Sequence, residues 1–179
     1  MLNIENTVLI VIDIQDRLAR VMPEKEILIE SFQKLLKGVQ ILGIPIILTE
    51  QNPKGLGLTI PEVANLLPGI QPIPKLSFSC CGEERFLQEL KALNRRQVLL
   101  SGIELHVCVY QTAMDLISLG YEVQVVADCV SSRAAKNREI GLEKIRSAGA
   151  SLTGTETVLF ELLKVAEGAK FKEISQLLK

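Results

Sequence analysis

The amino-acid sequence predicts an α/β fold in which helices cover both faces of a parallel sheet. One observation is an unbroken apolar run from Thr7 to Ile12, which is typical of a strand buried on both faces. A second is the alternation of such runs with segments of helical apolar spacing. A third is a helix–glycine–strand junction that occurs at Gly43, Gly120 and Gly149. A chain of 179 residues can bury one large core, so we expect a single domain spanning residues 1–179.

The first half of the chain is expected to contribute three strands and one long helix. After the first strand, residues 27–42 carry apolar side chains at helical spacing. The apolar segment 44–49 follows as the second strand, and the Gly/Pro-rich segment 50–61 follows as a loop. Residues 70–75 then form a short third strand that ends at Lys75.

The middle of the chain is expected to contain an amphipathic helix, a buried strand and a second helix. Residues 83–93 have helical spacing and begin with acidic side chains, which the helix dipole favours at that end. The apolar run 97–100 indicates the fourth strand. From about Val107 to Ile117 the apolar positions again recur at helical spacing, so a helix begins shortly after this strand.

The last third of the chain continues the alternation of strands and helices. Residues 121–127 are expected to form the fifth strand, and residues 138–147 the helix that follows it. Residues 150–153 form a short edge strand, Thr155 opens another helix, and residues 171–178 form a final amphipathic helix or an oligomer contact.

Composition and charge exclude several classes of protein. Lys and Arg total 20 against 21 Asp and Glu, and no basic stripe suggests a nucleic-acid partner. The N-terminus lacks the features of a signal peptide, and no apolar run reaches the roughly 18 residues that span a bilayer. The 4 cysteines have no regular spacing, which favours reduced thiols in a cytoplasmic protein. A single histidine argues against most metal sites and against Ser-His-Asp catalysis.

Two side chains that follow buried strands are candidates for chemistry. Asp13 is either a helix N-cap or a functional carboxylate, and the next helix begins late for capping, near Pro23. Cys108 lies on the first turn of a helix, where unpaired N–H groups and the helix dipole favour a thiolate. A free cysteine is also often just a small buried hydrophobe, so the pattern alone leaves both interpretations open. Both residues lie beyond the carboxyl ends of strands, where open α/β sheets bind ligands.

Four segments carry a resemblance to a known family. They are VIDIQDRL around Asp13, TEQNPKGLG from Thr49, the lysine-then-Phe-Ser pattern after Lys75, and SGIELHVCV around Cys108. Together they resemble the isochorismatase-like cysteine hydrolases, which include nicotinamidases and N-carbamoylsarcosine amidases. The chain is most similar to the isochorismatase domain-containing hydrolases of that family, nearly from end to end. The resemblance implies a three-layer α/β/α domain with six parallel strands in the Rossmann-like order 3-2-1-4-5-6.

The resemblance also implies a catalytic triad and an oxyanion hole. Asp13 would be the base, Lys75 its cationic partner and Cys108 the nucleophile. The backbone N–H groups of Glu104 and Cys108 would stabilise the oxyanion, and a cis peptide bond would join Ile103 to Glu104. A lone lysine is usually a solvated surface charge, so the role of Lys75 rests on the resemblance.

The resemblance places a substrate pocket beside the triad, lined by Gln15, Leu18, Glu50, Phe78 and Leu105. Leu18 stands where relatives often carry an aromatic side chain, so this wall of the pocket is expected to differ. Nicotinamidases of the family hold a metal ion with Asp and His side chains in the loop after the second strand. That loop has no histidine here, so we expect neither a metal nor another cofactor.

The protonation of the site stays open at this level. His106 is expected at the edge of the pocket, and a role as the base for Cys108 is an alternative. Lys75 and the helix N-terminus favour a resting thiolate on Cys108. The negative charge of Asp13 favours the opposite state, a thiol beside a carboxylate that loses its proton only on attack.

These residues predict a hydrolase that cleaves a small amide or carbamoyl C–N bond through an acyl-thioester on Cys108. Isochorismate hydrolysis is not implied, because family members with that activity lack this cysteine. Two alternatives use the same fold: a non-catalytic oligomeric scaffold, and a thiol redox protein in which Cys80, Cys81 or Cys129 resolves an oxidised Cys108. The expected partners are a small-molecule substrate and further copies of the chain, in a homodimer or larger assembly, with no nucleic acid and no membrane.

Overall fold

The computed structural model describes residues 1–179 and is built around one six-stranded sheet in which all paired strands are parallel. The strand order is β3-β2-β1-β4-β5-β6, so the predicted fold class and strand order are confirmed. The strands are β1 (Thr7–Ile12), β2 (Ile46–Gln51), β3 (Ile73–Lys75), β4 (Gln97–Ile103), β5 (Glu122–Ser131) and β6 (Ser151–Thr153).

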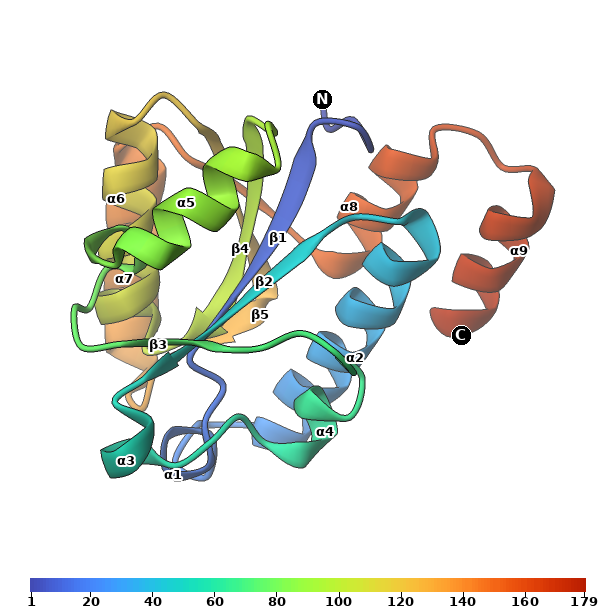
Figure 1. Ribbon diagram of the computed structural model, residues 1–179. Coiled ribbons are helices and arrows are strands. Elements are labelled where there is room, and N and C mark those ends of the chain that lie inside the picture. The colour runs from blue at the N-terminus through green and yellow to red at the C-terminus, as the bar shows by residue number, and fades with distance from the viewer.

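Helices cover both faces of the sheet and complete three layers (Figure 1). Helices α2 and α8 lie on one face with α9 outside them, α5, α6 and α7 lie on the other, and α1 and α3 lie at the end toward which the strands point. No helix of the chain combines the length and the apolar character needed to cross a membrane. The helices are α1 (Asp16–Ala19), α2 (Lys25–Leu42), α3 (Pro53–Leu56), α4 (Pro61–Ala64), α5 (Glu84–Ala92), α6 (Tyr110–Ser118), α7 (Ala135–Ser147), α8 (Thr155–Leu163) and α9 (Gly168–Leu177).

The sheet separates two hydrophobic clusters, because successive side chains of a strand point to opposite faces. In β1, Leu9 and Val11 pack in a cluster with Phe32 of α2. Val8 faces the other way and packs in a cluster with Phe86 of α5. Every residue of β1 is buried, so its unbroken apolar run reflects a strand covered on both faces, as the sequence predicts.

Strand β4 continues to Ile103, whereas the sequence predicts its end at Leu100. The extra residues include Ser101 and Gly102, which remain paired with β1. Gly102 has a φ of +150°, and a Cβ atom there would lie 2.5 Å from the carbonyl oxygen of Ile12. In the sequence, Ser101 and Gly102 resemble the end of a strand. In the structure, these small residues let β4 approach β1 closely at the end of β1.

Several further elements differ from their predicted bounds; β2 spans Ile46–Gln51 instead of 44–49, and α7 begins at Ala135 instead of Arg138. Strand β5 continues past Ala127 to Ser131, because a register shift in β4 between Leu100 and Gly102 lets the two strands pair again. The segment predicted as a loop at 50–61 contains the helix α3 and the start of α4. The helix after β4 begins with a π-helical turn, Leu105–Val109, before α6. Such π turns are frequent at functional sites.

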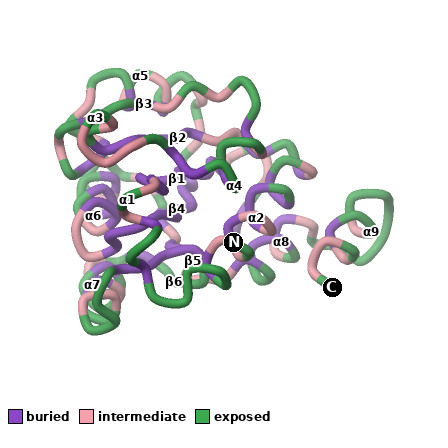
Figure 2. Tube along the Cα trace, turned by 90° about the horizontal axis from the view of Figure 1, so that it is seen from below, coloured by how far each residue is buried: buried purple, intermediate pink, exposed green.

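The strand order gathers the carboxyl ends of the central strands at one edge of the sheet. β1 lies between β2 and β4, and β2 lies beside β3, so the residues that follow these strands become neighbours. Seen from this edge, buried chain occupies the centre of the molecule and exposed chain its rim (Figure 2). Polar residues placed at these strand ends are therefore brought together inside the protein.

Candidate active site

Asp13 follows β1 directly and turns its side chain into the interior, with a positive φ of 58°. The residue is fully buried. Its Oδ1 accepts a hydrogen bond from Thr49 Oγ1 at 2.9 Å, and its Oδ2 lies 2.7 Å from Lys75 Nζ. Asp13 caps no helix, because the N-cap positions of α1 and α2 are Gln15 and Glu24. The carboxylate is therefore held by a hydroxyl and a cation, not by helix N–H groups.

Lys75 is the last residue of β3, and only 2% of its surface is exposed. Its Nζ donates to Gln51 Oε1 at 2.6 Å and to the Phe78 carbonyl oxygen at 3.0 Å, beside the contact with Asp13. Burial is the largest single effect and lowers the pKa of Lys75, but the charge and hydrogen bond of Asp13, together with the Cys80 and Cys108 thiols, outweigh it and raise the pKa overall. Lys75 is therefore a fixed ammonium and not a proton acceptor at neutral pH.

Cys108 lies in the π turn after β4, and 4% of its surface is exposed. Burial, followed by the charge of Asp13, raises the pKa of the Cys108 thiol to about 12, against a smaller opposing effect of Lys75. A hydrogen bond between Asp13 and the thiol acts in the same direction as burial. The resting site therefore contains a thiol beside a carboxylate, which is the second of the two forms left open by the sequence.

The expected cis peptide bond between Ile103 and Glu104 is wrong, since the chain contains no cis peptide bond. Glu104 instead adopts a left-handed conformation, with φ of 55° and ψ of 55°. This residue and Gly102, whose φ is also positive, turn the chain from β4 into the π turn. The Cys108 N–H donates to the Glu104 carbonyl oxygen at 3.1 Å, so one of the two expected oxyanion donors is engaged in the resting helix turn.

The Glu104 side chain is buried and faces the loop after β5. Its Oε1 lies 2.8 Å from Nε of Arg133, and its Oε2 lies 3.5 Å from Nδ1 of His106. The two ring nitrogens of His106 contact Ser132 Oγ at 2.9 Å and Asn137 Nδ2 at 3.4 Å. His106 is therefore held by the β5 loop and α7, and this arrangement gives no support to its role as the base for Cys108.

The predicted pocket residues occupy different environments. Gln15 is fully buried and donates to the carbonyl oxygens of Gln51 at 3.0 Å and Gly57 at 2.6 Å. Leu105 is fully buried in the cluster of α5 and α6, and half-buried Leu18 packs against the cluster of α2. Phe78 is 53% exposed. Of these four side chains only that of Phe78 is largely open to solvent. The main-chain carbonyl group of Phe78 is the one that accepts a hydrogen bond from Lys75.

Glu50, the fifth predicted pocket residue, is also engaged within the chain. Its Oε1 accepts hydrogen bonds from Thr59 N at 2.6 Å and from Thr59 Oγ1 at 2.7 Å. It thereby ties the end of β2 to the segment before α4. No group of three His, Cys, Asp or Glu side chains in the chain is arranged to hold a metal ion.

Two polar residues near the predicted triad were not expected from the sequence as parts of the site, and Cys80 was expected there only as a thiol that could resolve an oxidised Cys108. Thr49 and Gln51, both in β2, bind Asp13 and Lys75 respectively. Cys80 is fully buried, and its Sγ lies 3.8 Å from Thr49 Oγ1. Burial raises the pKa of the Cys80 thiol to about 12. The only sequence signal for Thr49 and Gln51 is that polar residues end an otherwise apolar strand.

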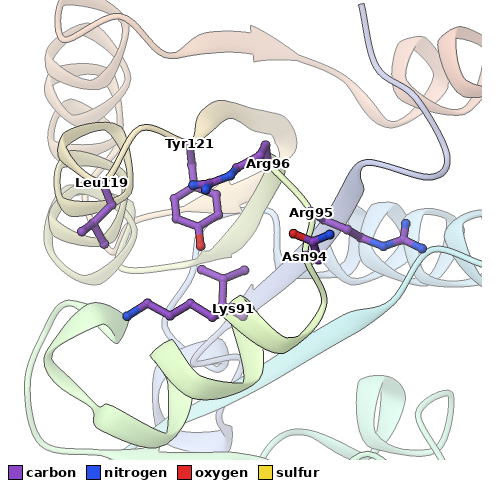
Figure 3. A pocket seen from close by; sticks show the side chains of 7 residues that line it. Lys91, Asn94, Arg95, Arg96, Leu119 and Tyr121 are labelled. Carbon is purple, nitrogen blue, oxygen red and sulfur yellow. The ribbon is translucent and has the colours of Figure 1, made fainter.

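A hollow of about 300 Å³ lies at the opposite edge of the sheet, where β4 and β5 begin (Figure 3). Arg96 lies over the ring of Tyr121 there, at 5.4 Å from its centroid. None of the predicted site residues lines this hollow; its walls are Leu90, Lys91, Asn94, Arg95, Arg96, Leu119 and Tyr121. The three residues of the predicted triad have no open access, because each of them is almost fully buried.

The fold and the site define a class of protein: a doubly wound α/β domain with a buried carboxylate–lysine pair beside a cysteine on the turn after β4. Residues 7–157 match the Isochorismatase domain. The chain belongs to the isochorismatase family.

Curated relatives and a solved structure extend this assignment over nearly the whole chain. Isochorismatase domain-containing protein 2 of Danio rerio is 40% identical over 178 residues, covering 99% of this chain and 89% of the relative. Isochorismatase domain-containing protein 1 of the same species is 40% identical over 167 residues, covering 93% of this chain and only 59% of the relative. The structure of MAR1 ribonuclease from Caenorhabditis elegans is 37% identical, covers 99% of this chain and 91% of that one, and has a TM-score of 0.93.

Proposed function

We propose that the protein is a cysteine hydrolase that cleaves a small amide or carbamoyl C–N bond. The observation that carries the proposal is the fully buried Asp13–Lys75 pair, 2.7 Å apart, beside the Cys108 thiol. Burying two charges is costly, and family membership makes a catalytic use of this pair the best explanation of its position. Asp13 and Lys75 carry opposite unit charges, so proton transfer from Cys108 occurs in a site without net charge.

In the proposed first step, Asp13 accepts the Cys108 proton as the sulfur attacks the substrate carbonyl carbon. The electron pair of the S–H bond forms the new C–S bond, and the carbonyl π electrons move to oxygen. Lys75 keeps its proton, because its raised pKa makes it a poor acid, and it holds Asp13 in place. The thiol is not ionised before attack, so deprotonation is coupled to the approach of the substrate.

The resulting oxyanion would lie against backbone N–H groups of the turn after β4. Glu104 supplies one donor, and Cys108 supplies a second that shares its hydrogen with the Glu104 carbonyl oxygen, 3.1 Å away. Asp13 then returns its proton to the leaving amine, the C–N bond breaks and an acyl-thioester remains. Water adds to the thioester, Asp13 takes one of its protons, and cleavage of the C–S bond releases the acid and restores the thiol.

The decisive experiment is an activity screen over small amides and carbamoyl compounds with the wild type and Cys108→Ala. Cys129→Ala is a matched control, because Cys129 is also fully buried but lies in the opposite hydrophobic cluster. We expect turnover that falls at least about a thousandfold in Cys108→Ala and persists in the control. Equal turnover in all three proteins would refute the proposal.

Two further measurements on Cys108, made beside the screen, would favour the alternatives on this fold. A peroxide-dependent mass shift on Cys108, with no turnover of any substrate, would favour the thiol redox protein. Absence of turnover together with an unreactive Cys108 would favour the non-catalytic scaffold. Both outcomes count against the hydrolase.

A further inference from the structure

Gln51 is the last residue of β2 and lies directly opposite Lys75 in the parallel pairing of β2 with β3. Its side chain is buried, and its Oε1 accepts a hydrogen bond from Lys75 Nζ at 2.6 Å. The contact between Lys75 Nζ and Asp13 Oδ2 is 2.7 Å. The ammonium group therefore has two equally close side-chain partners, of which one is charged and one is neutral.

The orientation of the Gln51 amide is determined by a second hydrogen bond. Its Nε2 donates to the Leu76 carbonyl oxygen at 2.9 Å. A flipped amide would turn its NH₂ group toward the Lys75 ammonium and its oxygen toward the Leu76 carbonyl, and both contacts would be repulsive. Gln51 can therefore present only its oxygen to Lys75.

The main chain of Gln51 is fixed as well, by a side chain that follows β1. The Gln51 N–H donates to Gln15 Oε1 at 2.7 Å, and Gln15 Nε2 donates to the Gln51 carbonyl oxygen at 3.0 Å. Gln15 lies two residues after Asp13 and is itself fully buried. A continuous set of hydrogen bonds therefore runs from the segment after β1, through Gln51, to the cation that pairs with Asp13.

We infer that Gln51 is a positioning residue for Lys75, which holds the ammonium group against Asp13 by means of a neutral acceptor. The inference rests on the proposed function in that Asp13 and Lys75 serve the chemistry of Cys108. The neutrality of the acceptor matters, because a carboxylate at position 51 would compete with Asp13 for the ammonium. A carboxylate at position 51 would also make the buried set of Asp13, Lys75 and residue 51 negative overall. Charges in such surroundings interact more strongly than in water.

The test measures the rate at which iodoacetamide alkylates Cys108, without any substrate, by peptide mapping between about pH 7 and pH 9. Gln51→Met keeps the length of the side chain and removes the acceptor, so Lys75 loosens and the rate falls about tenfold. Gln51→Glu adds negative charge and raises the pKa of the thiol, so its rate falls about tenfold at each pH, as expected for a rate–pH profile displaced upward by about one pH unit. In a Lys75→Met background, Gln51→Met has no further effect, because no cation remains to be positioned.

Val158→Ala is the control for loss of stability alone, since Val158 is a fully buried residue of α8 in the cluster on the other face of the sheet. If Gln51→Met and Gln51→Glu lower the thermal midpoint as this control does, yet alkylate at the wild-type rate, the inference is overturned. Equal slowing by Gln51→Met with and without Lys75 also overturns it. Because the measurement needs no turnover, a negative hydrolase screen leaves its result readable.

Discussion

Replacing Lys75 by methionine would leave the Asp13 carboxylate in a closed site without its cation. The two side chains are 0% exposed and their charged atoms lie 2.7 Å apart. Removing one partner of such a pair costs about 3–5 kcal/mol, because an uncompensated charge stays buried. Asp13 would keep the hydrogen bond from Thr49 Oγ1, 2.9 Å long, which stabilises the carboxylate. We therefore expect the lower end of that range, about 3 kcal/mol of unfolding free energy.

The loss in this variant should depend on pH. In the wild type the pKa of Lys75 is raised from 10.5, so the contribution of the pair is fully present below that value and is lost as pH rises through the folded-state pKa. Methionine has no proton to lose, so Lys75→Met lacks this contribution at every pH. The deficit of the variant against the wild type should therefore shrink as pH rises through the folded-state pKa of Lys75.

Urea unfolding at about pH 8 and about pH 11 measures the loss and its dependence on pH, provided that the slope with denaturant stays constant. Lys91→Met is the matched control, because Lys91 is an exposed lysine on α5, and its effect should stay within about 0.5 kcal/mol. The double variant Asp13→Asn/Lys75→Met removes both charges and should recover part of the loss. A deficit below about 1 kcal/mol in Lys75→Met at about pH 8, or one that grows at about pH 11, would refute the buried pair.

Three further outcomes are expected. Iodoacetamide at neutral pH should modify Cys108 before Cys81, because Asp13 can accept the Cys108 proton as the sulfur attacks, although burial raises the pKa of Cys81 less, to about 11 against about 12. Asp13→Asn or Lys75→Ala should slow that modification at least about tenfold, and equal labelling of all thiols in peptide maps would contradict a triad. Chelators should leave activity unchanged, whereas stoichiometric metal bound by residues 49–60 would contradict this. The chain should sediment as a homodimer or larger assembly, because apolar side chains remain uncovered, among them Leu76, which is 77% exposed, and Leu58, which is 67% exposed. Sedimentation as a monomer at micromolar concentration would refute this prediction.

The sequence predicts the fold well where burial alone determines the pattern. β1 is apolar throughout because helices cover both faces, and its predicted bounds match the structure. The length of β4 is underestimated, because Ser101 and Gly102 look like the end of a strand, whereas pairing with β1 continues through them. Backbone pairing of this kind depends on a strand that is distant in sequence, and no local pattern reveals it.

The site is only partly predictable for a similar reason. Asp13 and Cys108 follow buried strands, so position alone makes them candidates. No local pattern marks Lys75, so the prediction of its role depends on the resemblance to the family. The contact between Gln51 and Lys75 depends on the register of β2 against β3, which places the two residues opposite each other. The expected cis peptide was carried over from the family, whereas this chain makes the turn with a positive φ at Glu104.

Under the proposed function, the resting charges explain how a buried cysteine can be both protected and reactive. With a pKa of about 12, the Cys108 thiol holds its proton at neutral pH, and a protonated thiol is a poor target for oxidants. A substrate carbonyl beside the thiol changes the balance, since negative charge can then develop on an oxygen near N–H donors while the proton moves to Asp13. No free thiolate is required at any stage. Reactivity should therefore follow how well an electrophile places its oxygen at the turn after β4, more than how electrophilic it is in solution.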